Sequence, residues 1–426
     1  MIKLKKIIGY CIAAIMVPAA NAQSASVSQD TLKLSIDSLD RMFLQNNLQL
    51  LAQRYNIDAQ KALEAQAKIY PNPNVQFSTL LYNTQTKNWL PFGNNGEVTA
   101  QLSQEILLAG KRNKQVKMAQ ANTQLTQLQF IDLLQTLKYT LHTDFYTVYY
   151  LHQSASVYTD EINSLQTLTN GFETQLTQGN VSQKEALRVK AQLYSLQSEY
   201  NDLTNQINDA ESEMRIILHT AQVFVLPVVD EQRVNNLSSG QYALQTIVDS
   251  AMQNHPDLKI AKLNTQINQL NYNYQKSLAV PDLTLMAGYD QQSNVVKNFT
   301  SIGVGIDLPF FNRNQGNIRS AKFQEQMAQV NEQNTEATVQ ENIYNELTKA
   351  ATYDKLFRSR DPHFDGSFKT MQQATLASYR QRNISLLDFL DFYDAYKDNV
   401  LQINNLQINR MAAFEAINFY SGSNFY

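Results

Sequence analysis

The sequence predicts a mostly helical chain with a smaller β part, built from two copies of one unit. The unit runs helix, strand, strand, long helix, turn and helix. A stretch with strict alternation of apolar and polar residues runs directly into a long helical pattern at 299–321. The same succession occurs at 97–119, and each copy has a proline between its first helix and its first strand. A strand that feeds a long helix twice in one chain indicates duplication.

Composition limits the possible functions. The chain has 426 residues, which is enough for one duplicated domain or for two or three separate ones. Charged residues make up only 17%, and the formal net charge is −3, so we expect no nucleic-acid partner.

The N-terminus reads as a secretory signal, residues 1–22. A basic start is followed by the apolar stretch 7–20 and by an Ala-Asn-Ala cleavage pattern at 20–22. A retained membrane anchor is the alternative, but the apolar run is too short to span a bilayer. The only cysteine, Cys11, lies in this signal, so disulfides and zinc–thiolate sites are excluded from the mature chain. No later run of apolar residues is long enough for a transmembrane helix.

The first copy begins with a predicted helix over 35–69, ended by Pro71. Strands are predicted at 74–83 and 97–106. The tract 111–178 has no proline, and as one helix it would reach roughly 100 Å.

Gly179 and Asn180 break this tract. Ser182 can then cap the next helix, with Glu185 at the capping-box position, and the helix pattern continues to about Leu218.

The second copy follows an irregular segment. It has a helix over 242–279 ended by Pro281, then strands over 282–290 and 299–308. Its long helix is expected to break near Asp361–Pro362 and Asp365–Gly366. A turn at 382–385 precedes the last helix, which runs to about Asn418. The predicted organisation is a signal peptide, a first repeat, an equatorial linker and a second repeat, at residues 1–22, 23–219, 220–240 and 241–426.

The strands have the length that crosses a membrane at a tilt. Four strands cannot close a barrel, and an open sheet edge cannot lie in lipid. Either the strands form a soluble sheet or several chains pool them, and three chains would supply twelve strands. We favour the pooled barrel, with one strand face toward lipid (Val98, Ala100, Leu102, Ile302, Val304 and Ile306) and the other toward water (Thr99, Gln101, Ser301 and Gly303).

The order of elements, Pro71 and Pro281, and the paired turns at 179–182 and 382–385 resemble the TolC-like outer-membrane efflux factor family. The resemblance covers nearly all of the mature chain. It implies a trimeric twelve-stranded barrel in the outer membrane, continued by an α-helical periplasmic tunnel. It also implies docking to a periplasmic adaptor and an inner-membrane efflux pump. We expect the adaptor-docking tips to be the two turns: Gly179, Asn180, Val181 and Ser182, and Arg382, Asn383, Ile384 and Ser385.

The resemblance also places a tunnel constriction just after the second turn. Asp388, Asp391 and Asp394 follow at a spacing of three, which is equally typical of a solvated helix face. In the family, acids here line the closed end of the tunnel, and Asp388 and Asp391 stand at the matching positions. Tyr379 matches a tyrosine that bonds an acid after the first turn, here Glu185.

Two departures alter the family pattern of the second turn. Ile384 stands where reference members carry an arginine, and Arg382 stands where a glycine is usual.

The function predicted is a passive export duct for small molecules or metal ions, with no enzymatic activity. The five histidines lack metal-ligand spacing, and we find no phosphate loop, nucleophile elbow or HExxH motif. We therefore expect no cofactor and no bound metal. The alternative is a periplasmic coiled-coil adaptor, which would have one helical hairpin and no membrane-type strands. The sequence does not identify the cargo.

Overall fold

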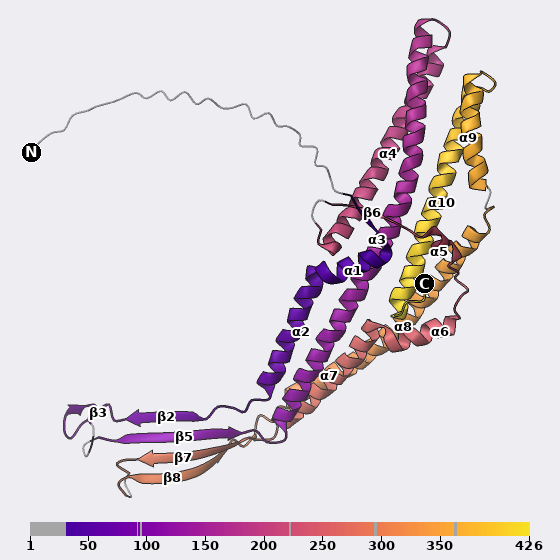
Figure 1. The fold of residues 1–426 in the computed structure, drawn as a ribbon. Helices are drawn as coiled ribbons and strands as arrows, with labels where there is room; N and C mark the ends of the chain where they lie inside the picture. Colours follow the sequence, from indigo (N-terminus) through magenta and orange to yellow (C-terminus); the bar gives the residue numbers. More distant parts are fainter. Residues whose placement is uncertain (1–30, 92, 94–95, 221–222, 294–295, 362–363) are drawn as a thin grey trace, which may run out of the picture.

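The computed structural model describes residues 31–426 except 92, 94–95, 221–222, 294–295 and 362–363. The predicted signal, residues 1–22, lies outside the described residues. A small sheet lies at one end of a body of long helices (Figure 1).

Each repeat contributes a pair of short helices and a long helical hairpin. The first repeat has α1 (Ile36–Asn46), α2 (Leu48–Ala67), α3 (Lys111–Thr177) and α4 (Gln183–Leu218). The second has α6 (Leu244–Asn254), α7 (Pro256–Leu278), α8 (Gln315–Arg358), α9 (Phe364–Arg380) and α10 (Leu386–Ser421). The duplicated plan predicted from the sequence is confirmed.

The longest helix, α3, runs unbroken for 67 residues, as predicted. That length corresponds to about 100 Å. The expected interruption of the second long helix is also present, because α8 ends at Arg358 and α9 begins at Phe364. Gly366 lies inside α9, so the break is shorter than predicted.

The first helix of each repeat was predicted as one piece and is in fact two. Asn47 separates α1 from α2: its side chain accepts a hydrogen bond from the Leu50 amide and donates one to the Ile217 carbonyl, at 2.7 Å. His255 separates α6 from α7, where Pro256 takes the first helical position. Both breaks begin a new helix with its own cap, so helical periodicity alone did not reveal them.

The predicted irregular linker contains regular structure. Strand β6 (Phe224–Pro227) pairs in parallel with β1 (Thr31–Leu34), and α5 (Glu231–Asn236) follows. The buried Arg410 of α10 holds this segment by donating to the carbonyls of Val234 and Leu237. The linker is therefore packed against the helical body.

The four long strands form one antiparallel sheet in the order β2-β5-β7-β8. Their bounds are Asn74–Thr79, Val98–Ile106, Leu283–Asp290 and Phe299–Ile306. The first predicted strand is shorter than expected. Its last residues form β3 (Tyr82–Asn83), which pairs instead with β4 (Asn88–Trp89) as a separate hairpin.

The strand register gathers the apolar residues on one face of the sheet. Val304 lies opposite Leu285, and Val75 lies opposite Leu102. The side chain of Ile302 on this face is 93% exposed. The same face holds Phe77, Ala100, Ile106, Leu283, Ala287 and Ile306. The opposite face is polar or small except for Met286 and Phe299. On this face Ser78 and Thr99 are joined by a hydrogen bond of 2.6 Å.

The helices next to the sheet keep the order of the strands that they continue. Helix α2 packs on α3, α3 on α7, and α7 on α8 (Figure 1). One buried apolar cluster lies where the short helices meet the hairpins, and a second lies between α3, α4 and α10 toward the tips. The second cluster therefore holds the helices together just below the tips.

Candidate functional site

The two hairpins end in turns of the same design. Gly179 and Arg382 both adopt left-handed backbone angles. The Asn180 amide donates to the Gln175 carbonyl, as the Asn383 amide donates to that of Ser378, each at 2.9 Å. This pattern closes the C-terminal end of a helix by satisfying its last carbonyls.

Each turn is followed by a complete capping box. The Ser182 hydroxyl accepts from the Glu185 amide, and the Glu185 carboxylate accepts from the Ser182 amide and hydroxyl. Ser385 and Asp388 repeat this arrangement at the start of α10. Glu185 and Asp388 thus have a structural role in fixing where the helices start.

A cleft of about 960 Å³ lies between the two tips. Its walls come from both hairpins, including Leu168 and Phe172 of α3 and Arg380 of α9. Seven of the predicted site residues line it: Asn180, Val181, Glu185, Tyr379, Arg382, Ile384 and Ser385. Gly179, Ser182 and Asn383 belong to the same tips but are not among the lining residues. Five of the eight residues predicted for docking, drawn from both turns, therefore line one cleft.

Tyr379 and Glu185 face the same cleft from different hairpins. Burial, and then the negative charge of Glu185, raise the pKa of the Tyr379 hydroxyl to about 12. The Tyr379 ring stacks on Phe389 with centroids 4.9 Å apart. The Glu185 carboxylate accepts hydrogen bonds from Ser182, and it acts on Tyr379 through its negative charge.

The aspartates of α10 lie outside the cleft lining. Asp388 and Asp391 are exposed, whereas Asp394 is half-buried and accepts a hydrogen bond of 2.8 Å from Gln192 of α4. Asp394 therefore ties the second hairpin to the first, and the two outer aspartates remain accessible to solvent.

A polar seam that the sequence did not reveal continues this tie. The Lys397 ammonium lies 2.8 Å from the Glu199 carboxylate of α4. Glu161 of α3 is only 1% exposed, and burial raises its pKa to about 8. Lys397 lies four residues after the buried Tyr393, on the same face of α10. This helical spacing is the one feature of the sequence that indicates its burial.

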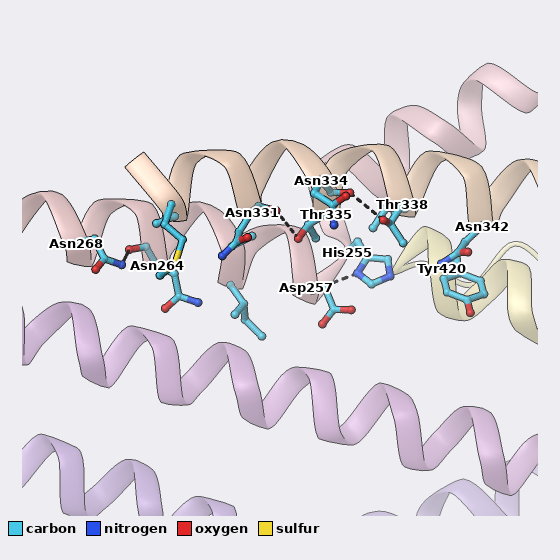
Figure 2. Close-up of a pocket in the computed structure, with 15 residues that line it drawn as sticks. His255, Asp257, Asn264, Asn268, Asn331, Asn334, Thr335, Thr338, Asn342 and Tyr420 are labelled. Carbon is cyan, nitrogen blue, oxygen red and sulfur yellow. Dashed lines mark hydrogen bonds between the residues drawn. The ribbon is translucent and has the colours of Figure 1, made fainter. Parts of the chain in front are cut away.

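A second cavity, of about 560 Å³, lies between α7 and α8, far from the tips along α8 (Figure 2). Seven of its fifteen lining residues are asparagine or threonine, and none of them was predicted as a site. At one end the Nδ1 atom of His255 accepts from the Asp257 amide, and burial lowers the pKa of this histidine. The lining offers uncharged hydrogen-bonding groups and one carboxylate, without a pairing of nucleophile and base.

A sheet with one exposed apolar face is continued by two long helical hairpins with paired tips. None of the described helices is long and apolar enough to cross a membrane. The family model described as "Outer membrane efflux protein" matches residues 40–218 and 247–423. The chain belongs to this family.

Individual relatives agree with this assignment. The cobalt-zinc-cadmium resistance protein CzcC of Cupriavidus metallidurans is 22% identical over 284 residues, which span 67% of this chain and 65% of that protein. The CmeC outer membrane channel of Campylobacter jejuni shares the fold with a TM-score of 0.74 at 16% identity, over 92% of this chain and 86% of CmeC. The MtrE channel of Neisseria gonorrhoeae, in its open state, gives 0.68 at 14% identity, over 91% and 89%.

These findings confirm the predicted class. The chain is an outer-membrane efflux protein, and the family match over both repeats fits this class and not the adaptor alternative.

Proposed function

We propose that three copies of the chain form a passive export duct. Their sheets close a twelve-stranded barrel in the outer membrane, and their helices form a tunnel through the periplasm. The tunnel receives cargo from a periplasmic adaptor and an inner-membrane pump, and the duct itself carries out no chemical reaction.

The observation that carries this proposal is that the sheet has two unpaired edge strands among the described residues. In the described part of the chain β2 and β8 are the outer strands of the sheet, each with one neighbour. An unpaired edge is not viable in lipid, so another copy must supply the missing neighbours.

The helices connected to these edge strands, α2 before β2 and α8 after β8, support the same closure. Exposed apolar side chains run along α2 and along α8, the two outer helices of the layer. They are Leu48, Leu51, Tyr55 and Leu63 on α2, and Met327, Val330 and Tyr344 on α8. Apolar stripes on both free sides suit a contact between α2 of one copy and α8 of the next.

The tips are the proposed docking site for the adaptor. Apolar side chains of both hairpins, Val181, Ile384, Leu168 and Phe172, line the cleft between them. An adaptor's helical hairpin would bury these side chains by packing into the cleft.

The constriction of the tunnel is proposed to lie at Asp388 and Asp391, together with Tyr379 and Glu185 of the neighbouring cleft. The exposure of both aspartates supports this, because three copies would bring six carboxylates around one axis.

Divalent metal ions are one proposed cargo class, and other small molecules are the second. The similarity to the cobalt-zinc-cadmium resistance protein of Cupriavidus metallidurans supports the first class. Growth of a deletion strain on cobalt, zinc and cadmium, compared with a panel of organic drugs, distinguishes them. Metal sensitivity that the gene restores supports metal export, and drug sensitivity alone contradicts it.

Light scattering of the mature protein in detergent tests the assembly directly. The expected mass of the protein component is that of three chains. A monodisperse monomer under conditions that preserve the helical signal would overturn the proposal.

A further inference from the structure

Exposed cations gather where the sheet meets the helices. All four connections between strands and long helices lie at the same end of the sheet (Figure 1). Each connection, or the helix end that adjoins it, carries at least one exposed Lys or Arg. We call this set the basic collar: Lys68 after α2, Lys117 in α3, Lys276 near the end of α7, and Arg313 and Arg319 around the start of α8.

The collar is positive in a chain whose formal net charge is −3. Asp282 is occupied by Lys111, whose ammonium lies 2.6 Å away. Glu105 belongs to the polar face of the sheet, and Asp307 continues the polar side of the strand pattern. Glu105 and Asp307 therefore offset part of the collar's charge, and the five collar cations outnumber them.

Helix stability explains only part of this distribution. Lys68 and Lys276 lie at the C-terminal ends of α2 and α7, where the macrodipole favours cations. The first turn of α3, by contrast, carries Lys111, Arg112 and Lys114 and no acidic residue. The helix macrodipole favours anions at a helix start and disfavours cations. A sequence that breaks a local rule in this way is typical of a functional surface.

Aromatic side chains accompany the cations. The Arg112 guanidinium lies 4.0 Å from the centroid of the Tyr70 ring, and the Lys276 ammonium lies 4.8 Å from that of Tyr272. Phe311, between β8 and α8, is 96% exposed. Aromatic rings beside Lys and Arg at the end of a membrane segment are typical of the headgroup region of a bilayer.

We propose that the basic collar binds the anionic headgroups of phospholipids in the membrane leaflet that faces the periplasm. The inference rests on the proposed function, because it requires the sheet to lie in the bilayer. The apolar sheet face ends at Ile306, and Leu308, Phe310 and Phe311 continue as exposed apolar groups. The collar thus lies at the depth where the hydrocarbon ends and phosphates begin.

A lipid surface fits these observations better than a soluble anion. A soluble anion needs a convergent pocket, whereas the collar residues are spread over four connections. Lys and Arg near an anionic membrane surface each strengthen binding by a factor of about five, and salt weakens the effect.

The experiment measures lipid binding to the full mature protein in neutral detergent by native mass spectrometry. The lipids are dioleoylphosphatidylglycerol and dioleoylphosphatidylcholine, and the variant is Lys68→Gln/Lys276→Gln/Arg313→Gln. We expect the wild-type protein to prefer phosphatidylglycerol and the variant to lose that preference by about tenfold or more. Raising the salt concentration should reduce the preference of the wild type.

The matched control is Lys184→Gln/Arg188→Gln/Lys369→Gln, which removes three exposed cations from the tip half of the hairpins. It should keep the preference of the wild type. Equal preference in the collar variant, or none in the wild type, overturns the inference. Glycerol 3-phosphate tests whether the collar binds a soluble phosphate. If it binds and phosphatidylglycerol does not, the inference is overturned. A protein that forms no trimer contradicts the proposed function instead.

Discussion

Gly179 and Arg382 occupy the same left-handed backbone position in the two hairpin turns, with φ angles of 74° and 60°. The duplication has therefore conserved the turn geometry while the residue changed. Glycine adopts this region freely, whereas a side chain costs about 1–2 kcal/mol there. The second turn consequently holds backbone strain that the first turn lacks.

The first prediction concerns this strain. Gly179→Ala should destabilise the first tip by about 1 kcal/mol, because a Cβ at this position meets open space and only the backbone penalty remains. Arg382→Gly should stabilise the second tip by about 0.5–1 kcal/mol. Hydrogen exchange of the tip amides measures both effects. Exchange should be faster in Gly179→Ala and slower in Arg382→Gly. A shift in the same direction for both variants would show that the turns are not equivalent.

The second prediction tests which face of the sheet meets lipid. Val304→Arg should prevent or weaken assembly, at a cost of about 2–4 kcal/mol if the residue lies near the middle of the bilayer. Ser301→Arg, on the other face of the same strand, should be mild. Yields of heat-stable trimer in membranes compare the two variants, and equal tolerance means that the faces are misassigned.

The sequence was sufficient for the architecture because the pattern was long and repeated. Alternation at 299–306 and at 98–106 identified strands, and the absence of proline in 111–178 identified one continuous helix. The breaks at Asn47 and His255 were missed, since a new helix that starts after one capping residue barely disturbs the apolar spacing.

The tip residues could be named from the sequence, but their common cleft could not. The cleft depends on how two hairpins more than 190 residues apart pack together. The same limit applies to the pairing of Lys397 with Glu199, which joins different repeats. Pairing between elements depends on the fold, and a single sequence contains no direct signal for it.

The third prediction tests the docking site. Cysteines introduced at Val181 and Ile384, both in the cleft between the tips, should crosslink to the periplasmic adaptor in cells. The matched control is a cysteine at Val228, which is exposed in the equatorial segment. Crosslinking from Val228 alone would place the adaptor at the equator.

The fourth prediction concerns Glu161, buried between the hairpins. Lys397 faces it with a favourable charge, and Asp394, Asp398 and Glu199 face it with unfavourable charges. Burial is the largest cause of its raised pKa, which moves from 4.5 to about 8.

Because the folded state holds this proton more tightly than the unfolded state, stability should fall as pH rises from about 4.5 to about 8 and then level off. Glu161→Gln removes this contribution and should stabilise the protein by on the order of 1–3 kcal/mol at pH 8. Unfolding of the two proteins at several pH values measures the difference. Asp160→Asn, at an exposed neighbouring position, is the control. A stability difference that does not change with pH rules out Glu161 as the titrating group.

The fifth prediction concerns the two exposed aspartates that follow the second turn. Three copies would place six carboxylates around one axis. Their combined negative charge would attract divalent cations, which relieve the repulsion among the carboxylates. We expect millimolar divalent cation to block the single-channel conductance of the purified trimer, and the block to disappear in Asp388→Asn/Asp391→Asn. Asparagine keeps an oxygen that can accept the Ser385 hydrogen bonds, so the capping box of α10 should survive the change.

The control is Asp202→Asn/Asp209→Asn, which neutralises two exposed acids of α4 away from the second turn. It should keep the block, because charges farther than about 8–10 Å from the narrowest point are screened in physiological salt. The alternative role of Asp388 and Asp391, a solvated helix face, predicts the same conductance with and without the cation. A block that persists in Asp388→Asn/Asp391→Asn, with the trimer intact, would place the constriction at other residues of the tunnel.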